Sequence, residues 1–432
     1  MRFIATGDTI LTGYYTKDYA GHRALAEFIR SADVRFNNME TPLVDDWCTV
    51  SAFSGGHWIR TPTSRLDDLA DFGFNCFSFA NNHGLDFFYT GLLSTIRAFR
   101  ARGLAFAGAG EDLESATRHC KVETPNGSLA LVALTTTCEP SCIAGPPSGA
   151  IPGRPGVGML RHSAKYFVSA EQMAALRAVA EDTKVNGRIK NRRALGSVVV
   201  DEGTFPFGPL SFEVGPAGRM TYPDPYDTAR YEKAVKAAAA DADRTVVYIH
   251  THETKGESDA EPDFFVETFA RSCLDWGADA VICSGTHQVK GVEIYDGKPI
   301  FYSIANFCFR ATDLDYYPLE WYEKYKLDKS LTIREAENVR SKGGTIGLLT
   351  QAYNFRAIAP LIEWDDAGSA VKIAALPIGL GFHEPMDGTK GFPRIGDAED
   401  TAALLGALTK TCAPYGTRVT LGEDGLFTFT KA

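Results

Sequence analysis

Short apolar runs alternate with amphipathic segments along the first third of the chain. Runs rich in Val, Ile, Phe and Cys are typical of strands buried on both faces, and the segments between them have helical spacing. The expected elements, in order, are a strand at 2–6, a helix at 22–31, a strand at 34–38, a helix at 64–72, a strand at 75–80, a helix at 88–101 and a strand at 104–107. This alternation predicts crossover units and a largely parallel sheet.

The middle of the chain interrupts this pattern. Asn126-Gly127 between two apolar runs predicts a hairpin, and residues 138–225 then hold many prolines and glycines, with one predicted helix at 169–181. The basic run KVNGRIKNRR at 184–193 is typical of solvated surface. Irregular insertions beside a catalytic face often cover the substrate, so we expect residues 138–225 to form a lid.

Alternation resumes after residue 225 and continues to the C-terminus. It predicts helices at 231–242, 263–276 and 401–411, strands at 245–250, 280–283, 345–351, 362–364 and 371–376, and a strand–turn–strand over 291–307 that turns at Asp296-Gly297. We therefore predict one α/β domain over residues 1–432, with the insertion at 138–225 and a C-terminal extension at 345–432.

Charge and cysteine content exclude several classes of function. The net charge is −10 without a long basic run, which argues against a nucleic-acid partner and against an anionic membrane surface. The chain starts directly with a strand and has no transmembrane stretch, so we expect a cytoplasmic protein. The nine cysteines show no C-x-x-C spacing and are expected to be reduced, although Cys138 and Cys142 share one turn and are candidates for a disulfide.

Five of the apolar runs end in groups that bind metals or transfer protons. These groups are Asp8; Glu40; Asn82, His83 and Asp86; His250, His252 and Glu253; and His287. The carboxyl ends of several buried strands meet in space even when they are far apart in sequence. A convergence of Asp, Glu, Asn and His is the chemistry of a metal-assisted acid–base site.

In two of these groups the residues are spaced so that their side chains can act together. Asp86 lies three residues after His83 and can hold its imidazole in one tautomer, although the same segment also fits a capped helix N-terminus. His250 and His252 point to the same side if their strand continues that far. The other histidines lack such a context and are interpreted as structural or surface residues: His22, His57, His119, His162 and His383.

Read in order, the motifs resemble those of one protein family. GD at 7–8, NME at 38–40, ANNHGLD at 80–86, GRPGVG at 153–158, the strand that ends at His250, and GTHQVKGVEIYDGKPIFYSIANF at 285–307 resemble the CapA family. These are poly-γ-glutamate capsule-type proteins of the calcineurin-like metallophosphatase superfamily, and the resemblance covers roughly residues 1–310. It implies a sandwich of two mixed β-sheets flanked by helices, with a metal site at one edge. It also implies metal-site roles for Asp8, Glu40, Asn82, His250 and His287, and a proton-handling role for His83.

Two positions depart from the superfamily pattern. Phosphatases of the superfamily have a histidine two places after the first aspartate, where this chain has Ile10, and the first histidine of their final G-H-x-H is Gly285 here. His252 is a possible substitute for one of the lost imidazoles. The remaining oxygen-rich set favours Ca, Mg or Mn over Zn or Fe, and it predicts one metal ion rather than two. Two-metal phosphoester hydrolysis is correspondingly disfavoured.

The favoured hypothesis is therefore a metal-dependent peptide epimerase, an isomerase, because a branch similar to CapA epimerises lasso-peptide precursors. In this hypothesis two histidine–carboxylate pairs exchange protons with a peptide Cα: His83 with Asp86, and His250, His252 or His287 with a carboxylate that the sequence does not identify. The alternatives are amide hydrolysis of a peptide or poly-γ-glutamate chain, phosphoester hydrolysis, and a binding protein without turnover. The expected partner is a peptide or γ-glutamyl substrate, and the oligomeric state stays open.

Overall fold

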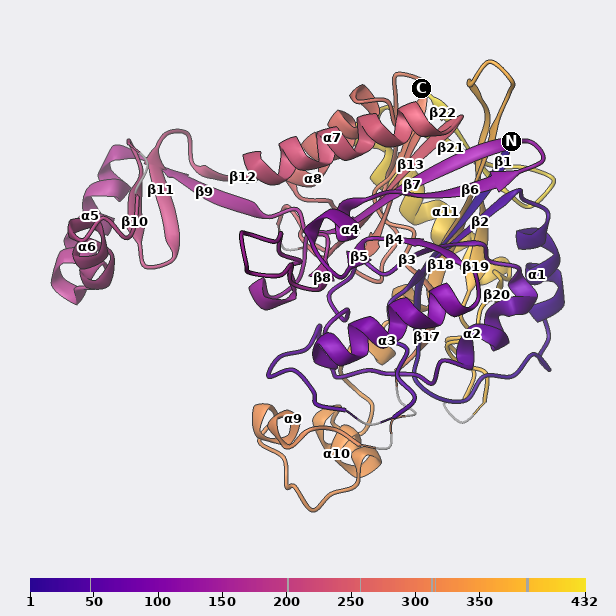
Figure 1. Cartoon of the computed structure of the whole chain (residues 1–432), viewed down its shortest axis with the longest axis horizontal. Helices are drawn as coiled ribbons and strands as arrows, with labels where there is room; N and C mark the ends of the chain where they lie inside the picture. Colours follow the sequence, from indigo (N-terminus) through magenta and orange to yellow (C-terminus); the bar gives the residue numbers. More distant parts are fainter. Residues whose placement is uncertain (47, 200–201, 257, 312–313, 315, 386–387) are drawn as a thin grey trace.

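The computed structural model describes residues 1–432 except residues 47, 200–201, 257, 312–313, 315 and 386–387. Its body is a pair of mixed β-sheets with helices on their outer faces (Figure 1). The two sheets share one apolar core, in which the rings of Phe36 and Tyr248, one from each sheet, lie 5.0 Å apart between centroids. The predicted α/β sandwich is confirmed.

The first sheet has ten strands and is mixed. Its central strand β1 pairs in parallel with β2 and β17 and antiparallel with β18. The strands are β1 (Arg2–Leu11), β2 (Val34–Met39), β3 (Cys76–Ser78), β4 (Ala105–Ala107), β17 (Asn306–Arg310), β18 (Arg356–Trp364), β19 (Ala370–Gly379), β20 (Arg394–Ile395), β21 (Thr417–Leu421) and β22 (Phe427–Lys431). The parallel half carries the N-terminal motifs, and the antiparallel half comes from the C-terminal part of the chain.

The second sheet has six strands in the order β15-β16-β14-β13-β7-β6. They are β6 (Cys120–Thr124), β7 (Gly127–Thr135), β13 (Arg244–Thr251), β14 (Ala280–Gly285), β15 (Val292–Tyr295) and β16 (Lys298–Phe301). β13 lies in parallel between β7 and β14, so their carboxyl ends share one edge. The hairpin predicted at Asn126-Gly127 is confirmed as the antiparallel pair β6–β7.

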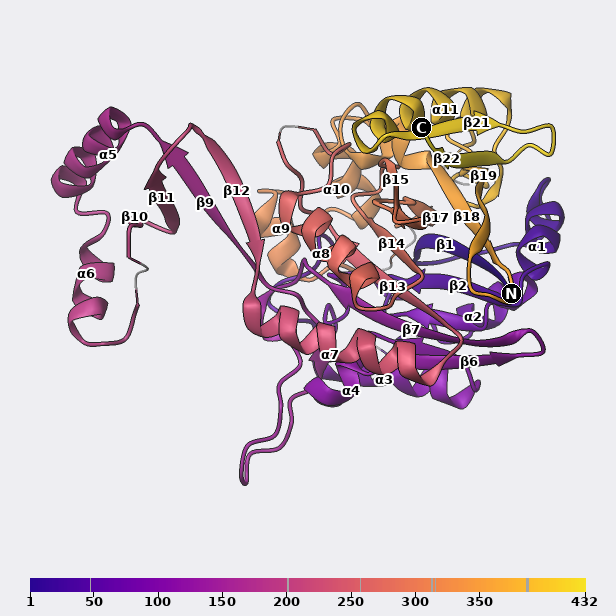
Figure 2. The ribbon, with the colours of Figure 1, turned by 90° about the horizontal axis from the view of Figure 1, so that it is seen from above.

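Helices cover the outer faces of both sheets. They are α1 (His22–Arg30), α2 (Arg65–Asp68), α3 (Phe88–Ala101), α4 (Leu113–Thr117), α7 (Pro225–Asp241), α8 (Phe264–Asp275) and α11 (Ala398–Cys412), with short 3-10 helices η1 (Leu69–Phe72), η2 (Pro140–Cys142) and η5 (Ala413–Tyr415). α3 buries Leu92, Ile96 and Phe99, which recur at helical spacing. α7 and α8 bury Tyr231 and Phe269 in a separate core against the second sheet (Figure 2).

Much of the insertion forms a lobe that projects from the body (Figures 1 and 2). The lobe holds β9 (His162–Val168), α5 (Ala170–Thr183), α6 (Gly187–Ala194), β10 (Phe205–Phe207), β11 (Leu210–Val214) and β12 (Gly218–Pro223), while β5 (Ala109–Gly110) and β8 (Gly156–Val157) pair beside the body. The helix predicted at 169–181 is confirmed as α5. The four-stranded sheet of the lobe was not predicted, because its short strands lack a buried, apolar pattern.

A helical segment after the last motif strand differs from its prediction. It contains α9 (Leu319–Lys324), α10 (Ile333–Arg340), η3 (Leu348–Thr350) and η4 (Ala352–Phe355). The strand predicted at 345–351 is wrong, because Gly343, Gly344 and Gly347 have φ values of 70°, 77° and 111° and break extended backbone. The segment is anchored by Trp321, which is fully buried and stacks on Tyr317.

Two further expectations concern membranes and thiols. Within the described residues, every helix is too short or too polar to span a bilayer. All nine cysteines are free thiols, so the disulfide considered between Cys138 and Cys142 is absent from the structure.

Candidate metal centre and acid–base site

Asp8 reaches the site through a bulge in the middle of β1. The strand continues to Leu11 rather than ending at Asp8, and its register shifts at Asp8 against both parallel neighbours. A Cβ on Gly7 would lie 1.8 Å from the carbonyl oxygen of Ala305, so only glycine permits this approach. The bulge redirects the Asp8 side chain, as bulges beside active sites commonly do.

The Asp8 carboxylate is fully buried and already bonded. It accepts hydrogen bonds from the Asn38 amide at 2.8 Å, from the backbone N–H of Gly285 at 3.0 Å, and from the Ser284 hydroxyl. Burial alone would raise its pKa, but His250, His287 and Ser284 outweigh this effect and hold the pKa at about 2. Asp8 is therefore an anion at neutral pH.

Glu40 is the most unusual group in the site. It follows β2 and is completely buried, yet neither carboxylate oxygen has a hydrogen-bond partner among the described residues. Burial, and then the neighbouring charges of Asp8 and Asp86, raise its pKa well above the usual 4.5. A buried carboxylate without a partner is costly, and a bound cation is the simplest way to satisfy it.

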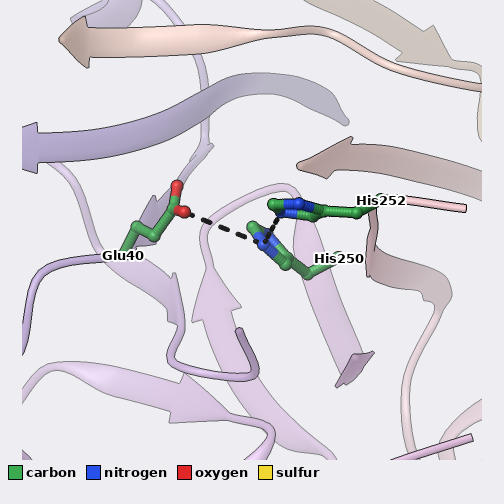
Figure 3. A group of neighbouring side chains, drawn as sticks. All are labelled: Glu40, His250 and His252. Carbon is green, nitrogen blue, oxygen red and sulfur yellow. Dashed lines mark hydrogen bonds and ion pairs between the residues drawn. The ribbon is translucent and has the colours of Figure 1, made fainter. Parts of the chain in front are cut away.

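His250 and His252 bring imidazole nitrogens to Glu40 (Figure 3). His250 Nε2 lies 3.8 Å from Glu40 Oε1, 3.2 Å from His252 Nε2 and 2.8 Å from Asn82 Oδ1. β13 continues to Thr251, and the two histidines lie on the same side, as strand alternation predicts. Burial first, and then His250 and His287, lower the pKa of His252 well below 6.5, so its imidazole is neutral.

The donor atoms of these residues form two overlapping groups, each within 4.8 Å. One consists of Glu40, His250 and His252, and the other of Asp8, Glu40 and His287. Asn82 adds a neutral amide oxygen beside His250. Carboxylates, an amide and neutral imidazoles fit a divalent cation, and the Glu40 oxygens, which accept no hydrogen bond among the described residues, have lone pairs free to bind it.

The position of Gly285 explains why one superfamily histidine is missing. Gly285 has φ of 124°, and a Cβ there would lie 2.4 Å from the carbonyl oxygen of Thr251 and 2.9 Å from His252 Cδ2. His252 therefore occupies space that a side chain at position 285 would need. At the other departure, the buried Ile10 lines the cavity above the site and offers no ligand atom.

His287 is held by an amide rather than by a carboxylate. Its Nδ1 lies 2.8 Å from Asn306 Oδ1, and its backbone adopts φ of 58°. Burial is the main cause of its lowered pKa. The second histidine–carboxylate pair expected for epimerisation is thus not formed by His287, and Asn306 is a site residue that the motif reading missed although it lies in the YSIANF run.

His83 and Asp86 form a tightly fixed dyad. His83 Nδ1 lies 2.7 Å from Asp86 Oδ2, and the backbone N–H groups of Gly55 and Ile59 each donate to the Asp86 carboxylate at 3.0 Å. Burial raises the pKa of Asp86, against the opposing effect of His83. With Nδ1 donating to Asp86, Nε2 is left free, 3.9 Å from Glu40 Oε1.

Glu253 does not belong to the site, although it follows the same strand. Its carboxylate accepts hydrogen bonds from the hydroxyls of Thr137 and Thr251 at 2.9 Å, and from Thr136. It lies outside both metal-capable groups. Two of these partners, Thr136 and Thr137, directly follow β7, which the sequence could not place beside β13.

A cavity of about 710 Å³ opens above the metal-capable groups. Asn82, His83, His252 and His287 line its floor, and residues from 324–353 form its outer wall. His57, interpreted from sequence as structural or surface, also lines this cavity. No described residue of the insertion at 138–225 lines this cavity. Its residues Cys138, Glu139, Met159 and His162 line an adjoining cavity of about 260 Å³, which shares Asn82 with the first.

His57 makes the stability of this wall depend on pH. Burial, and then the charges of Arg340, His83 and Lys324, lower its pKa from 6.5 to about 3. Between these values the unfolded chain binds a proton that the folded chain does not, so the free energy of unfolding falls as the pH drops from 6.5 towards 3. We expect His57 to contribute about 1.4 kcal/mol of this loss per pH unit.

Urea unfolding at several pH values checks this prediction, with His57→Gln as the comparison. The glutamine variant should show a shallower loss of stability below pH 6.5. Parallel pH profiles for the two chains would contradict it.

The sequence of this chain is similar to those of several known proteins. The y4sH protein of Sinorhizobium fredii is 28% identical over 435 residues, which cover 98% of this chain and 91% of the relative. The PGA biosynthesis protein CapA of Bacillus subtilis is 22% identical over 70% of this chain and 62% of its own length. A probable polyglutamine synthesis accessory protein of Mycobacterium tuberculosis is 26% identical over 52% of this chain and 43% of the relative. The model of the bacterial capsule synthesis protein family PGA_cap matches residues 2–311, and the chain belongs to that family.

Proposed function

We propose that this protein is an enzyme dependent on one divalent metal ion that hydrolyses amide bonds in a γ-glutamyl or related peptide chain. The observation that carries the proposal is the unpartnered, buried carboxylate of Glu40 beside the His83–Asp86 dyad, on the floor of a large cavity. The substrate class follows from the relatives, whose names refer to PGA and polyglutamine synthesis.

Asp8, Glu40, Asn82, His250, His252 and His287 would hold the metal ion. A bound divalent ion supplies a Lewis acid that polarises a carbonyl group. The hard oxygen donors favour Ca, Mg or Mn, and the three imidazoles also allow Zn or Fe. The absence of ligands at Ile10 and Gly285 argues for one ion and against the two-metal phosphoesterase mechanism.

His83 would transfer the proton during amide hydrolysis. Its free Nε2 takes a proton from the attacking water, whose hydroxyl adds to the carbonyl carbon, and returns that proton to the amide nitrogen as the C–N bond breaks. Asp86 fixes the tautomer through Nδ1 and stabilises the imidazolium between these two transfers. The dyad is rigid, because Gly55 and Ile59 hold the Asp86 carboxylate from the backbone.

Cα epimerisation is the second candidate, and one observation favours it. His252 and His287 are neutral imidazoles in the same cavity as the carboxylate-backed His83, so a base and an acid are both available to one bound carbon. It ranks second because the lowered pKa values make His252 and His287 weak bases for a Cα proton. Besides the metal ion, amide hydrolysis requires only one histidine–carboxylate dyad, which His83 and Asp86 provide.

Incubation of the metal-loaded protein with γ-linked and α-linked glutamyl oligomers in D2O separates these reactions. Mass spectrometry should show shortened chains from the γ-linked substrate, and a sample treated with a chelator should show none. Deuterium at Cα without chain shortening would replace hydrolysis by epimerisation. A metal-loaded protein that changes neither oligomer would contradict both.

A further inference from the structure

The outer wall of the active-site cavity comes from a segment beyond the family match. The match ends at residue 311. The cavity that contains His83 is also lined by Lys324 at the end of α9, by Tyr325 directly after it, and by Glu337 and Arg340 on α10. In Figure 1 these two helices form a unit of their own beneath α3. This wall therefore lies beyond the residues that the family model matches.

Two cations on this wall are arranged around one aromatic ring. Lys324 Nζ lies 5.3 Å and the Arg340 guanidinium 5.4 Å from the centroid of the Tyr325 ring. Arg340 donates from Nε to Glu337 at 2.8 Å, and its two terminal nitrogens lie beside Gly347, 3.9 and 4.0 Å from where a Cβ would be. Within the described part of the chain, neither Lys324 Nζ nor these terminal nitrogens contact an acceptor.

Among the described residues, the nearby carboxylates do not accept hydrogen bonds from Lys324 Nζ or from the terminal nitrogens of Arg340. Glu337 is held by Arg340 Nε, by the Tyr317 hydroxyl at 3.4 Å and beside His57 Nδ1 at 3.7 Å. His57 is neutral at physiological pH because its pKa is about 3, so it adds no competing charge. Asp259, the other carboxylate on the cavity lining, belongs to the loop before α8 rather than to this wall.

We infer that Lys324 and Arg340 form a carboxylate-binding subsite that selects acidic chains for the chemistry on the cavity floor. The paired terminal nitrogens of an arginine match the two oxygens of a carboxylate, and a lysine adds a third donor. The inference rests on the proposed function for its substrate, a γ-glutamyl chain. The bound carboxylate is either the free α-carboxylate carried by an internal γ-linked residue or the carboxylate at the chain end.

Binding of three synthetic γ-linked glutamate trimers to the metal-loaded full chain tests the subsite. One trimer keeps all its carboxylates, one has its internal α-carboxylates converted to amides, and one has only its C-terminal residue amidated. Calorimetry is performed in a His83→Ala background, so that no substrate is consumed. We compare Lys324→Met and Arg340→Lys with Lys326→Met, which removes the same charge from the same segment outside the cavity.

Lys324→Met should weaken binding of the unmodified trimer about tenfold, as loss of a charge-assisted contact does. Arg340→Lys should weaken it less, and Lys326→Met should leave it unchanged. If the subsite recognises a carboxylate that has been amidated, that trimer should bind weakly to the parent, and Lys324→Met should weaken its binding no further. The trimer that behaves in this way identifies the recognised carboxylate. Equal affinities for all trimers, or equal effects of the Lys324 and Lys326 variants, would overturn the inference even if His83-dependent turnover is observed. Selective binding without turnover would instead contradict only the proposed reaction.

Discussion

Replacement of Glu40 by glutamine is expected to remove metal binding while leaving the fold intact. The carboxylate is the one group common to both metal-capable clusters, and its oxygens have no hydrogen-bond partner among the described residues. We expect metal affinity to fall by about a hundredfold or more, since even residues that only support metal ligands commonly cost 10–100-fold. The metal-free variant should be at least as stable as the metal-free parent, because it no longer buries an unpaired ionisable group.

Thermal unfolding with and without added Mn²⁺ or Ca²⁺ measures both effects. At a metal concentration about 100 times the Kd, binding should stabilise the parent by about 2.7 kcal/mol and the variant by almost nothing. Glu253→Gln is the matched control, since Glu253 follows the same strand as the histidines but is bonded to threonine hydroxyls. That control should lose stability and keep its metal affinity. A Glu40→Gln protein that binds metal normally would disprove the assignment of the centre.

The same carboxylate makes metal binding depend on pH. Because burial and the charges of Asp8 and Asp86 raise the pKa of Glu40 above 4.5, the metal-free folded chain retains a proton that the unfolded chain has lost. The metal-free protein therefore loses stability as the pH rises above 4.5. Metal binding removes that proton, so affinity increases with pH over the same range.

His83→Ala should lower turnover by about 10²–10⁴-fold, the usual contribution of a general acid–base group. Metal affinity should change little, because His83 lies outside both metal-capable groups. Asp86→Asn is expected to lower turnover by about 10–100-fold and to alter its pH profile, since Asp86 acts through the imidazole that it holds. This change of profile distinguishes positioning from a purely structural role.

His119→Ala provides the control for the dyad. His119 also contacts a carboxylate, Asp241, at 3.1 Å, but the pair lies at the surface and outside the cavity. Its loss should leave turnover unchanged. Activity in His83→Ala close to that of the parent would remove His83 from the mechanism and leave only the metal centre.

The site residues that the sequence predicted are those at the ends of buried strands. Asp8, Glu40 and His250 each lie in or directly after a buried strand, and parallel pairing brings such strand ends to a common edge. Local spacing also identified the dyad, since His83 and Asp86 are only three residues apart. The spacing could not show that Glu253 lies outside the site, because two of its threonine partners, Thr136 and Thr137, lie more than a hundred residues earlier in the chain.

The outer wall of the cavity was not predictable from sequence. The only element predicted within residues 319–353 is the strand at 345–351, which is wrong. The position of this segment depends on the burial of Trp321 among Tyr317, Tyr325 and His57. Such an aromatic cluster is recognisable only once the chain is folded. The place of His57 at the cavity could not be predicted for the same reason, since its partner Tyr325 lies 268 residues away. The projecting lobe was missed as a sheet because its strands are half-exposed.

The close approach of His252 to Gly285 has a consequence for how such sites diverge. The two positions compete for a single volume, so an imidazole can enter from one strand or from the other but not from both. A side chain at position 285 would require the His252 imidazole to move, and it would also clash with the Thr251 carbonyl oxygen at a backbone φ of 124°. A histidine at position 285 therefore requires changes in the backbone as well as at position 252.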